Sequence, residues 1–466
     1  MSDTLMISVS GMRGHVGTDL TPELVARHAA AFGAWVRTAA SPQIAGAHRS
    51  DTRPAVVLGR DARTSGPMFA RAATAGLMSV GVDVIDLGVV PTPTVQMAVE
   101  HHRAGAGLIL TASHNPIEWN ALKFVGPDGI FLDEASGARV RALAEQGPPR
   151  MGWDGIGEVR DDPEAVGRHL DAVLALPTID PAAIRRRGFH VALDCVRGAG
   201  ATAMPALLER LGCRVSGINL QPDGHFPRPP EPIPENLGEL GRLVQEVGAD
   251  IGFAVDPDVD RLAVVDERGR PIGEDYTLAF AVRAVLDGRP TAAEIATVVV
   301  NLSTSLVVED AARAGGARLV RAPVGEANVA RAIRDEGAVI GGEGNGGVML
   351  PALHIGRDAP LGVALILQLL AQSGAKVSEL VAAAPRYSIV KAKGPRGPEL
   401  QPLYDRLRKR FADAEVDERD GLRLAWRDRW LHVRPSGTEP IVRLIAEAPT
   451  EADAQALVAA GRDLLH

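Results

Sequence analysis

Apolar, β-branched runs recur along the chain, and each is followed by a helix-like stretch, a glycine and a second apolar run. The three copies begin at AVVLGRD (residues 55–61), FHVALDC (189–195) and ATVVVNLS (296–303). Continuous apolar strands that alternate with helices are typical of parallel sheets covered on both faces. The pattern therefore predicts an α/β protein with three related units, although unrelated α/β proteins also contain strand–helix–strand runs.

Proline and glycine mark the boundaries between these units. The segment EQGPPRMGWDG (145–155) cannot form a regular element, and the proline-dense segment 221–236 reads as a long ordered loop. From about Val377 the pattern changes to a smaller unit, which ends in a helix with Thr450 as its N-cap. The predicted domains are 1–155, 156–262, 263–374 and 375–466.

Composition describes an ordinary globular protein. A chain of 466 residues is too long for one core, and 46% apolar with 23% charged residues is typical of soluble domains. The net charge of -8 does not suggest a nucleic-acid surface. Neither a signal peptide nor an apolar run of about 18 residues is present, so a cytoplasmic protein without a membrane partner is expected.

A serine directly follows a strand-like run in LILTASHNPIEWNALKF (108–124). Pro116 disfavours helix at the preceding residue, so Ser113 is expected on a turn with an accessible hydroxyl. A serine hydroxyl is a weak nucleophile unless it is activated or already phosphorylated, and the G-x-S-x-G turn of α/β-hydrolases is absent. Lys123 follows as a cation that could return to the same site. The alternative is a polar turn without chemistry.

Three carboxylates stand at alternate positions in DPDVDR, at Asp256, Asp258 and Asp260. Held together in a loop they repel one another unless a divalent cation compensates them, and oxygen ligands favour Mg²⁺ or Ca²⁺. An EF-hand does not fit, because Arg261 occupies the position of its glycine. The loop therefore predicts a magnesium site, with a solvated acidic turn as the alternative.

A glycine-rich segment, VIGGEGNGGVMLP (339–351), places Glu343 and Asn345 just past a short apolar strand. Glycines let a ligand approach the backbone closely, while glutamate and asparagine offer the acceptors and donors that sugar hydroxyls need. Alone this signal is weak, since a glycine-rich turn without a ligand has the same composition.

The segment RPSGTEP stands between two strand-like runs within 429–448. Arginines, hydroxyls and free backbone N–H groups are the groups that bind phosphate. The nucleotide P-loop sequence is absent, so ATP is not implied. The alternative is a hairpin loop with incidental arginines. The candidate phosphate ligands are Arg434, Ser436, the Gly437 amide, Thr438 and Arg443.

In this order, and over nearly the whole chain, the four stretches resemble the α-D-phosphohexomutase superfamily of phosphoglucomutases, phosphomannomutases and phosphoglucosamine mutases. TASHNP is similar to its phosphoserine loop, DPDVDR to its metal loop, GEGNGG to its sugar-recognition loop and RPSGTEP to its phosphate-binding loop. The resemblance implies three related mixed-sheet α/β domains plus a smaller α+β C-terminal domain, arranged around a central cleft.

The resemblance also implies roles, position by position. Ser113 would be the phosphoserine, and its phosphate would hold Mg²⁺ together with the three aspartates, while Lys123 matches the family's proposed general base. His114 and Arg261 would lie in the inner part of the site, and Arg13 and Arg60 would lie at the phosphoserine end. Glu343 would recognise the sugar. The phosphate that is not transferred would be bound by Arg434, Ser436, Gly437 and Thr438.

The implied activity moves phosphate between the 6- and 1-hydroxyls of a hexose through a hexose 1,6-bisphosphate, which would also prime unphosphorylated enzyme. The expected partners are small sugar phosphates, and the chain is expected to be a monomer or a homodimer. A sugar phosphatase and a non-catalytic sugar-phosphate sensor are the rival functions of a different class.

The sugar loop departs from one common family pattern. Many members carry a serine and a histidine, as G-E-x-S-G-H, where this chain has Asn345 and Gly347. The GGEGNGG version, followed by HIGRDA, looks most like a branch described as phosphoglucosamine mutases. Glucosamine phosphate is therefore the predicted substrate, with glucose and mannose phosphates as alternatives.

Overall fold

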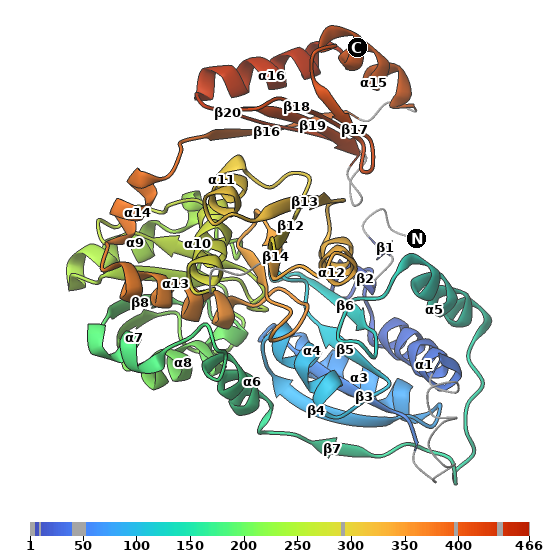
Figure 1. The fold of residues 1–466 in the computed structure, drawn as a ribbon. Helices are drawn as coiled ribbons and strands as arrows, with labels where there is room; N and C mark the ends of the chain where they lie inside the picture. The colour runs from blue at the N-terminus through green and yellow to red at the C-terminus, as the bar shows by residue number, and fades with distance from the viewer. Residues whose placement is uncertain are drawn as a thin grey trace.

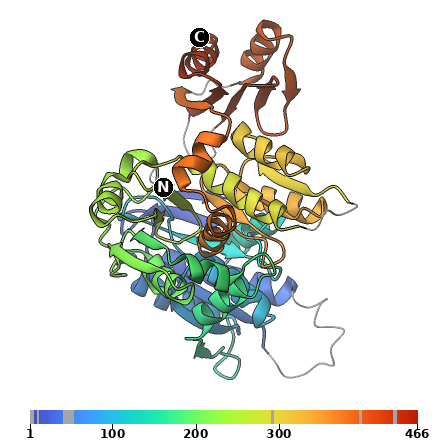
Figure 2. The same ribbon diagram turned by 60° about the vertical axis from the view of Figure 1, so that its left-hand side comes forward.

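The structure is a computed structural model that describes residues 5–8, 11–39, 53–289, 294–395, 399–435 and 441–465. The chain folds into four units, and the fourth stands at one end of the other three (Figures 1 and 2). The first three are mixed-sheet α/β units and the fourth carries an antiparallel sheet, which confirms the predicted fold class.

The first unit is a mixed sheet in the order β1-β2-β6-β5-β3-β4-β7. Helices α1, α3 and α5 cover one face and α4 covers the other, and each face has its own apolar cluster. The strands are β1 (Met6–Ser8), β2 (Gly11–His15), β3 (Ala55–Arg60), β4 (Asp83–Val89), β5 (Ala106–Leu110), β6 (Trp119–Val125) and β7 (Val159–Asp161). The helices are α1 (Pro22–Ala39), α3 (Gly66–Met78), α4 (Thr92–His101) and α5 (Glu134–Gln146).

The second unit has the sheet order β11-β10-β8-β9. Because β11 pairs with β10, this unit continues at least to Val265. Its strands are β8 (His190–Asp194), β9 (Arg214–Ile218), β10 (Ile251–Val255) and β11 (Leu262–Val265). Its helices are α6 (Ala165–Leu174), α7 (Pro181–Arg187), α8 (Met204–Arg210) and α9 (Gly238–Val247), with short 3-10 turns at Ala199–Thr202 and Pro234–Asn236.

The third unit has the sheet order β13-β12-β14-β15. Its strands are β12 (Thr297–Asn301), β13 (Arg318–Ala322), β14 (Ile340–Glu343) and β15 (Gly347–Met349). Its helices are α10 (Glu274–Asp287), α11 (Leu306–Ala314), α12 (Glu326–Asp335), α13 (Ala359–Ser373) and α14 (Val377–Ala383). The second and third units share one continuous apolar cluster, so they form a single packed body.

The three units repeat one topology. In each, a central strand pairs in parallel with the next strand on one side and with a third strand on the other, and the third strand turns back into an antiparallel fourth. Three of the predicted site loops occupy the same place in this repeat. They follow or end the third strands β5, β10 and β14, so the fold brings equivalent edges of three sheets together.

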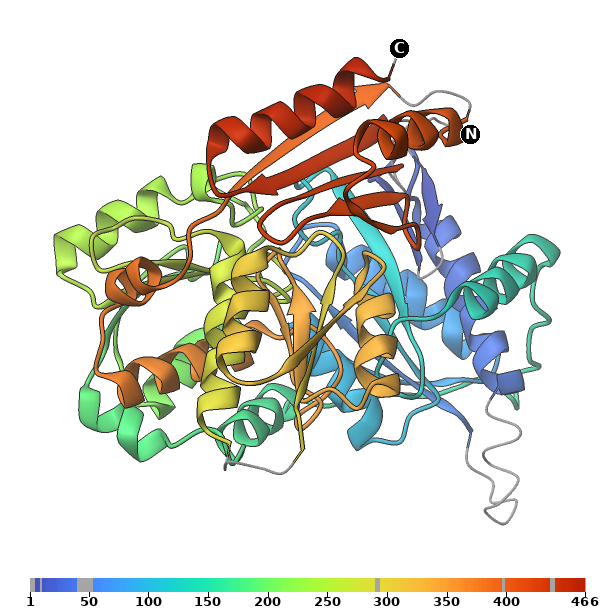
Figure 3. The same ribbon diagram turned by 45° about the horizontal axis from the view of Figure 1, so that its top comes forward.

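The fourth unit is an antiparallel sheet in the order β16-β20-β19-β18-β17, with α15 and α16 on its outer face (Figures 1 and 3). It has an apolar cluster of its own. Thr450 caps α16 by accepting a hydrogen bond from the Asp453 amide, which confirms the predicted N-cap. The elements are β16 (Ser388–Pro395), α15 (Gln401–Arg410), β17 (Glu415–Asp417), β18 (Leu422–Ala425), β19 (Trp430–Pro435), β20 (Ile441–Ala448) and α16 (Glu451–Asp463).

Among the described residues, no single helix combines the length and apolar character needed to cross a membrane. Helices α13 and α14 reach that threshold only as a pair, and they are bent by 83° relative to each other.

Candidate active site

Ser113 lies in the turn after β5, and the backbone of this turn is strained. Its φ angle is 49°, a left-handed conformation that costs a residue with a side chain on the order of 1 kcal/mol. The Ser113 amide donates to Thr111 Oγ1 at 2.9 Å, and the Thr111 hydroxyl donates to Asp61 Oδ2 at 2.6 Å. Held in this way, the Ser113 hydroxyl donates to Asp256 Oδ2 across 2.9 Å.

Arg63 supports the same turn, although the sequence analysis did not single it out. Its guanidinium is fully buried and pairs with Asp61 at 3.0 Å. It donates to four main-chain carbonyls, those of Ser113, Asn115, Pro116 and Trp119, at 2.6 to 2.9 Å. No local motif marks this role, because the acceptors are defined only when the turn has folded over the arginine.

The three aspartates after β10 form a buried cluster. No more than 1% of Asp256, Asp258 or Asp260 is exposed, and one oxygen of each lies within 4.8 Å of the others. Burial, reinforced by the charges of Asp260 and Asp258, raises the pKa of Asp256 well above its ordinary value. The cluster is therefore electrostatically costly without a compensating cation.

Two oxygens of this cluster are available to such a cation. Asp258 Oδ2 accepts from Lys123 at 2.7 Å and from Thr92 at 3.0 Å, and Asp260 Oδ2 pairs with Arg357 at 2.5 Å. The Oδ1 atoms of both aspartates are buried and have no hydrogen-bond partner within the described part of the chain. Orphaned carboxylate oxygens beside Ser113 fit a hard divalent cation such as Mg²⁺.

Lys123 projects from β6 into the site and is held as an ammonium ion. Burial alone would lower its pKa, but the carboxylates of Asp258 and Asp260 raise the pKa above the ordinary lysine value. An ammonium ion can stabilise phosphoryl oxygens and donate a proton to a leaving oxygen. The role of general base, which the resemblance implies for Lys123, requires the neutral amine instead.

Glu343, at the end of β14, is fully engaged by its neighbours. Its Oε1 accepts from Asn301 at 2.9 Å and from the Gly325 amide at 3.1 Å, and its Oε2 pairs with Arg357 at 3.1 Å. Burial would raise its pKa, but Arg357 and Asn301 lower it below the ordinary value. Glu343 is therefore an ionised, oriented carboxylate at the edge of the cavity.

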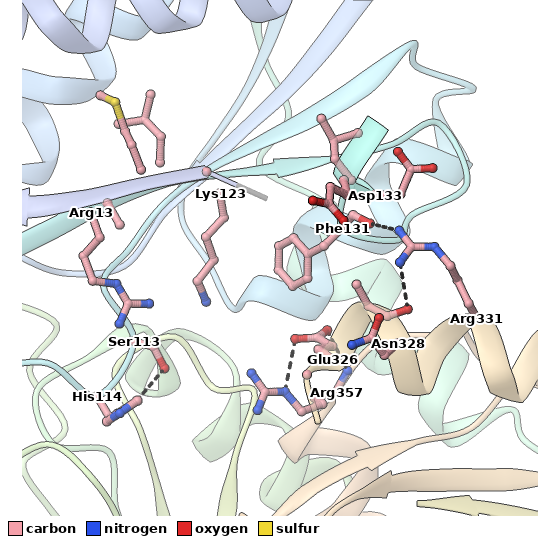
Figure 4. A pocket seen from close by; sticks show the side chains of 18 of the residues that line it. Arg13, Ser113, His114, Lys123, Phe131, Asp133, Glu326, Asn328, Arg331 and Arg357 are labelled. Atoms are coloured by element: carbon pink, nitrogen blue, oxygen red, sulfur yellow. Dashed lines mark hydrogen bonds and ion pairs between the residues drawn. The ribbon is translucent and has the colours of Figure 1, made fainter. Parts of the chain in front are cut away.

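Two neighbouring cavities lie between these loops. One, of about 670 Å³, is lined by Ser113, Lys123 and Arg357 together with residues of α12 (Figure 4). The other, of about 860 Å³, lies between the first three units and the sheet of the fourth. Arg13 and His114 line both cavities, so they stand where the two meet.

His114 and Arg13 lie close to the serine turn. His114 Nδ1 is 3.4 Å from Ser113 Oγ, and Arg13 donates to Asn115 Oδ1 at 2.6 Å. Burial, together with the charge of Arg261, lowers the pKa of His114 to about 2. The imidazole is therefore neutral, and Arg13 supplies the positive charge at this junction.

The fourth unit supplies the far wall of the larger cavity. Asn345 faces this wall, which carries Arg434 and Arg443, and Arg434 forms an ion pair with Asp420 at 2.9 Å. Lys391 and Lys393 of β16 line the same wall and were missed because no motif surrounds them. The predicted phosphate ligands Ser436, Gly437 and Thr438 lie outside the described residues.

The structure separates the two predicted arginines Arg60 and Arg261. Arg261 lines the smaller cavity, and its guanidinium pairs with Glu231 at 3.2 Å. Arg60 instead lines a pocket with residues of α3 and β4 and does not line either cavity of the site. Its role stays a prediction, while Arg63 contacts the serine turn.

The assembled site offers a serine oxygen beside a buried cluster of aspartates, a wall of ammonium and guanidinium groups, and an oriented carboxylate at the cavity edge. Phosphoryl transfer needs alignment and neutralisation of the phosphoryl oxygens more than covalent help from the protein. Groups of this kind supply both, so the geometry suits transfer of phosphate to and from Ser113.

Four family models match the chain in order. They describe phosphoglucomutase/phosphomannomutase alpha/beta/alpha domains I, II and III and the C-terminal domain, and they match residues 5–150, 168–269, 273–387 and 390–464. The matches cover most of the chain and follow the four units of the fold.

Individual relatives are similar over nearly their whole length. A phosphoglucomutase/phosphomannomutase of Thermococcus kodakarensis is 38% identical, with 98% of this chain and 97% of the relative covered. A probable phosphoglucosamine mutase of Methanopyrus kandleri is also 38% identical, with 96% and 95% covered. The crystal structure of a phosphoglucomutase/phosphomannomutase family protein from Burkholderia thailandensis superposes with a TM-score of 0.83 at 27% identity, with 99% and 98% covered.

Proposed function

The chain belongs to the phosphoglucomutase/phosphomannomutase family, and from that premise we propose that it interconverts glucosamine 6-phosphate and glucosamine 1-phosphate through a phosphoserine at Ser113. It is a phosphohexomutase, which confirms the class predicted from its loops. The specific hexose, the phosphoserine and the roles of the side chains are the proposal.

One observation carries the assignment of Ser113. Its hydroxyl contacts Asp256 at 2.9 Å, next to the two orphaned oxygens of Asp258 and Asp260. A phosphate on this hydroxyl would add negative charge to three buried carboxylates beyond what Lys123 and Arg357 offset, and a bound cation would compensate it. The residues that would hold Mg²⁺ are the three aspartates and the phosphate on Ser113, and the ion would neutralise the phosphoryl oxygens.

The reaction then has two matching halves. A sugar hydroxyl attacks the phosphorus, the bond from phosphorus to Ser113 Oγ breaks, and the proton of the attacking hydroxyl passes to the released Ser113 Oγ, which gives a hexose 1,6-bisphosphate and free serine. After the sugar turns over in the cavity, Ser113 Oγ attacks the other phosphorus, the bond from that phosphorus to the sugar oxygen breaks, and the serine proton passes to the sugar oxygen before the product leaves. Arg434 and Arg443 are suited to bind whichever phosphate is not reacting, since guanidinium groups bind phosphate without reading the rest of the sugar.

Two observations support glucosamine. Relatives described as probable phosphoglucosamine mutases are 32 to 38% identical to this chain over nearly its whole length. In addition, Glu231 places a carboxyl group on the wall of the larger cavity, where Asn345 also lies. An ammonium group on carbon 2 gains more from a carboxylate than a neutral hydroxyl does.

The direct test is turnover of the 6-phosphates of glucosamine, N-acetylglucosamine, glucose and mannose under the same conditions. We expect the highest kcat/KM with glucosamine 6-phosphate, and faster turnover of another sugar would refute the proposed substrate. Release of free phosphate in place of the isomer would favour a phosphatase. Glu231→Gln sharpens the test, because it should lower kcat/KM for the glucosamine sugar more than for the glucose sugar.

A further inference from the structure

Arg357 lies between the metal loop and the sugar loop and contacts both. Its guanidinium pairs with Asp260 at 2.5 Å and with Glu343 at 3.1 Å. A third ion pair joins it to Glu326, the first residue of α12, at 3.1 Å (Figure 4). A single side chain thus forms ion pairs with carboxylates from three separate segments of the active site.

The surroundings fix this guanidinium in place. Arg357 is only 7% exposed, and its own backbone amide also donates to Glu326, at 3.3 Å. A planar fork that satisfies three carboxylates cannot turn toward one without releasing another. The position of Arg357 therefore determines how Asp260 and Glu343 face the cavity.

Gly347 provides the space through which Arg357 passes. A Cβ atom on Gly347 would lie 2.3 Å from Arg357 Cδ and 2.8 Å from its Cγ. The backbone of Gly347 is not in the left-handed region, in contrast to that of Gly346, whose φ is 87°. A glycine at 347 is therefore required for the space that Arg357 occupies and not for a special backbone conformation. Gly347 also pairs with Glu343 across β14 and β15.

We infer that Arg357 is a positioning residue whose single guanidinium orients both the metal loop and the sugar loop. Gly347 provides the space that the Arg357 side chain needs. In the G-E-x-S-G-H pattern a histidine stands at the position of Gly347, and its Cβ would occupy the path that Arg357 takes here. The pair Gly347 and Arg357 is thus an alternative construction of the same part of the site. The inference rests on the proposed roles of the three aspartates and Glu343.

The first test is Arg357→Ala, measured on both loops. Loss of the guanidinium removes the ion-pair partner of Glu343 Oε2, so KM for the hexose phosphate should rise about tenfold. It also removes the cation nearest to Asp260, so Mg²⁺ binding followed by calorimetry should become several times tighter. General damage to the site would weaken both hexose phosphate binding and Mg²⁺ binding, and that outcome would overturn the inference. Arg334→Ala, on the exposed face of α12, is the matched control and should change neither quantity.

The second test is a double-mutant cycle. Gly347→Ala should displace Arg357 and raise KM by several fold, while the same change added to Arg357→Ala should cost less than about twofold, since the obstructed side chain is gone. Equal factors in both backgrounds, or no effect of Gly347→Ala alone, would disprove the link. Gly238→Ala, where the nearest atom to an added Cβ is 3.8 Å away, controls for the loss of a glycine.

These outcomes remain informative if the proposed substrate is wrong. The cycle is run with whichever hexose phosphate the wild type converts fastest, so a different preferred sugar removes the substrate proposal without touching the link between Gly347 and Arg357. Should Arg357→Ala fail to fold, Gly347→Ala alone decides, because full activity at the wild-type Tm would show that Arg357 needs no such space.

Discussion

The two walls of the active site are built in different ways. On the wall of Ser113 the functional groups are buried and held by neighbours from several units, as in the contact of Lys123 with Asp258. On the wall of the fourth unit Lys391 is more exposed, with 64% of its side chain accessible against 14% for Lys123. One wall is organised for chemistry at a fixed point, and the other for binding a charge.

The apolar packing behind the two walls also differs. The second and third units share one apolar core, whereas the fourth has its own. Its junction with the third unit includes polar contacts, in which Glu447 accepts from the Leu306 amide at 2.8 Å and Ser303 meets His432 at 2.8 Å. Polar interfaces of this kind permit relative movement of domains. The comparison indicates that the wall of Ser113 is fixed and the wall of the fourth unit is adjustable.

The largest effect is expected from Ser113→Ala. Removing the oxygen proposed to carry the phosphate should lower turnover by at least about a thousandfold, because the covalent route would be lost. Intact-mass measurement should find a phosphate on the wild type treated with hexose 1,6-bisphosphate and none on the variant. Ser373→Ala, at the exposed end of α13, should remain fully active. Substantial turnover by Ser113→Ala would contradict the phosphoserine proposal.

A somewhat smaller loss is expected from Asp258→Asn. The variant removes one ligand of the proposed cation and the partner of Lys123, so turnover should fall by about a hundredfold, well beyond any change in Tm. Mg²⁺ should raise the Tm of the wild type and much less that of the variant, since a ligand stabilises only the state that binds it. Full activity of the wild type in excess chelator would exclude the metal site.

Much of this architecture could be predicted from the sequence. The apolar runs identified the repeated units because buried parallel strands require continuous apolar residues, and the chemistry-bearing loops followed because such strands end at a common edge. Thr450 was identified as a cap from local chemistry alone. These features depend on residues that are close together in the sequence, so a single sequence contains the information needed to predict them.

The parts that escaped prediction depend on tertiary contacts. Arg60 ends β3 and Arg63 follows three residues later, and only the folded turn shows that Arg63 donates to the carbonyls around Ser113. Arg357 lies in the quoted HIGRDA segment, yet its three carboxylate partners are distant in sequence. A guanidinium at the end of a long side chain can reach many positions, so its partners are set by packing and not by spacing.

A moderate effect on the opposite wall is expected from Arg434→Ala. Loss of one charge-assisted contact to phosphate costs about 1.5 to 3 kcal/mol, which corresponds to a rise of roughly 10- to 100-fold in KM. The value of kcat should change less than in Asp258→Asn, since Arg434 does not contact the transferring group. Arg429→Ala, on the neighbouring turn, should leave KM unchanged. A fall in kcat without a rise in KM would show that Arg434 acts in the chemical step, and the contrast between the two walls would then be weaker.

The smallest effect concerns pH and the junction between the walls. Asp275, next to the junction, accepts from the Ser305 amide at 2.9 Å, and burial, the main cause, raises its pKa to about 8. An unfolded aspartate loses its proton near pH 4. Between these values the folded state binds more protons than the unfolded state, so this group makes stability fall as pH rises from about 4 to about 8.

Asp275→Asn tests this sign directly, because asparagine keeps the oxygen that accepts from Ser305 but does not titrate. The fall in Tm between about pH 5 and pH 8 should be smaller in the variant than in the wild type by a few degrees. Asp287→Asn, exposed at the end of the same helix, should reproduce the wild-type profile. If Asp275→Asn left the fall as steep as in the wild type, Asp275 would be ionised in the folded protein across this range, and the junction would be held by charge and not by neutral hydrogen bonds.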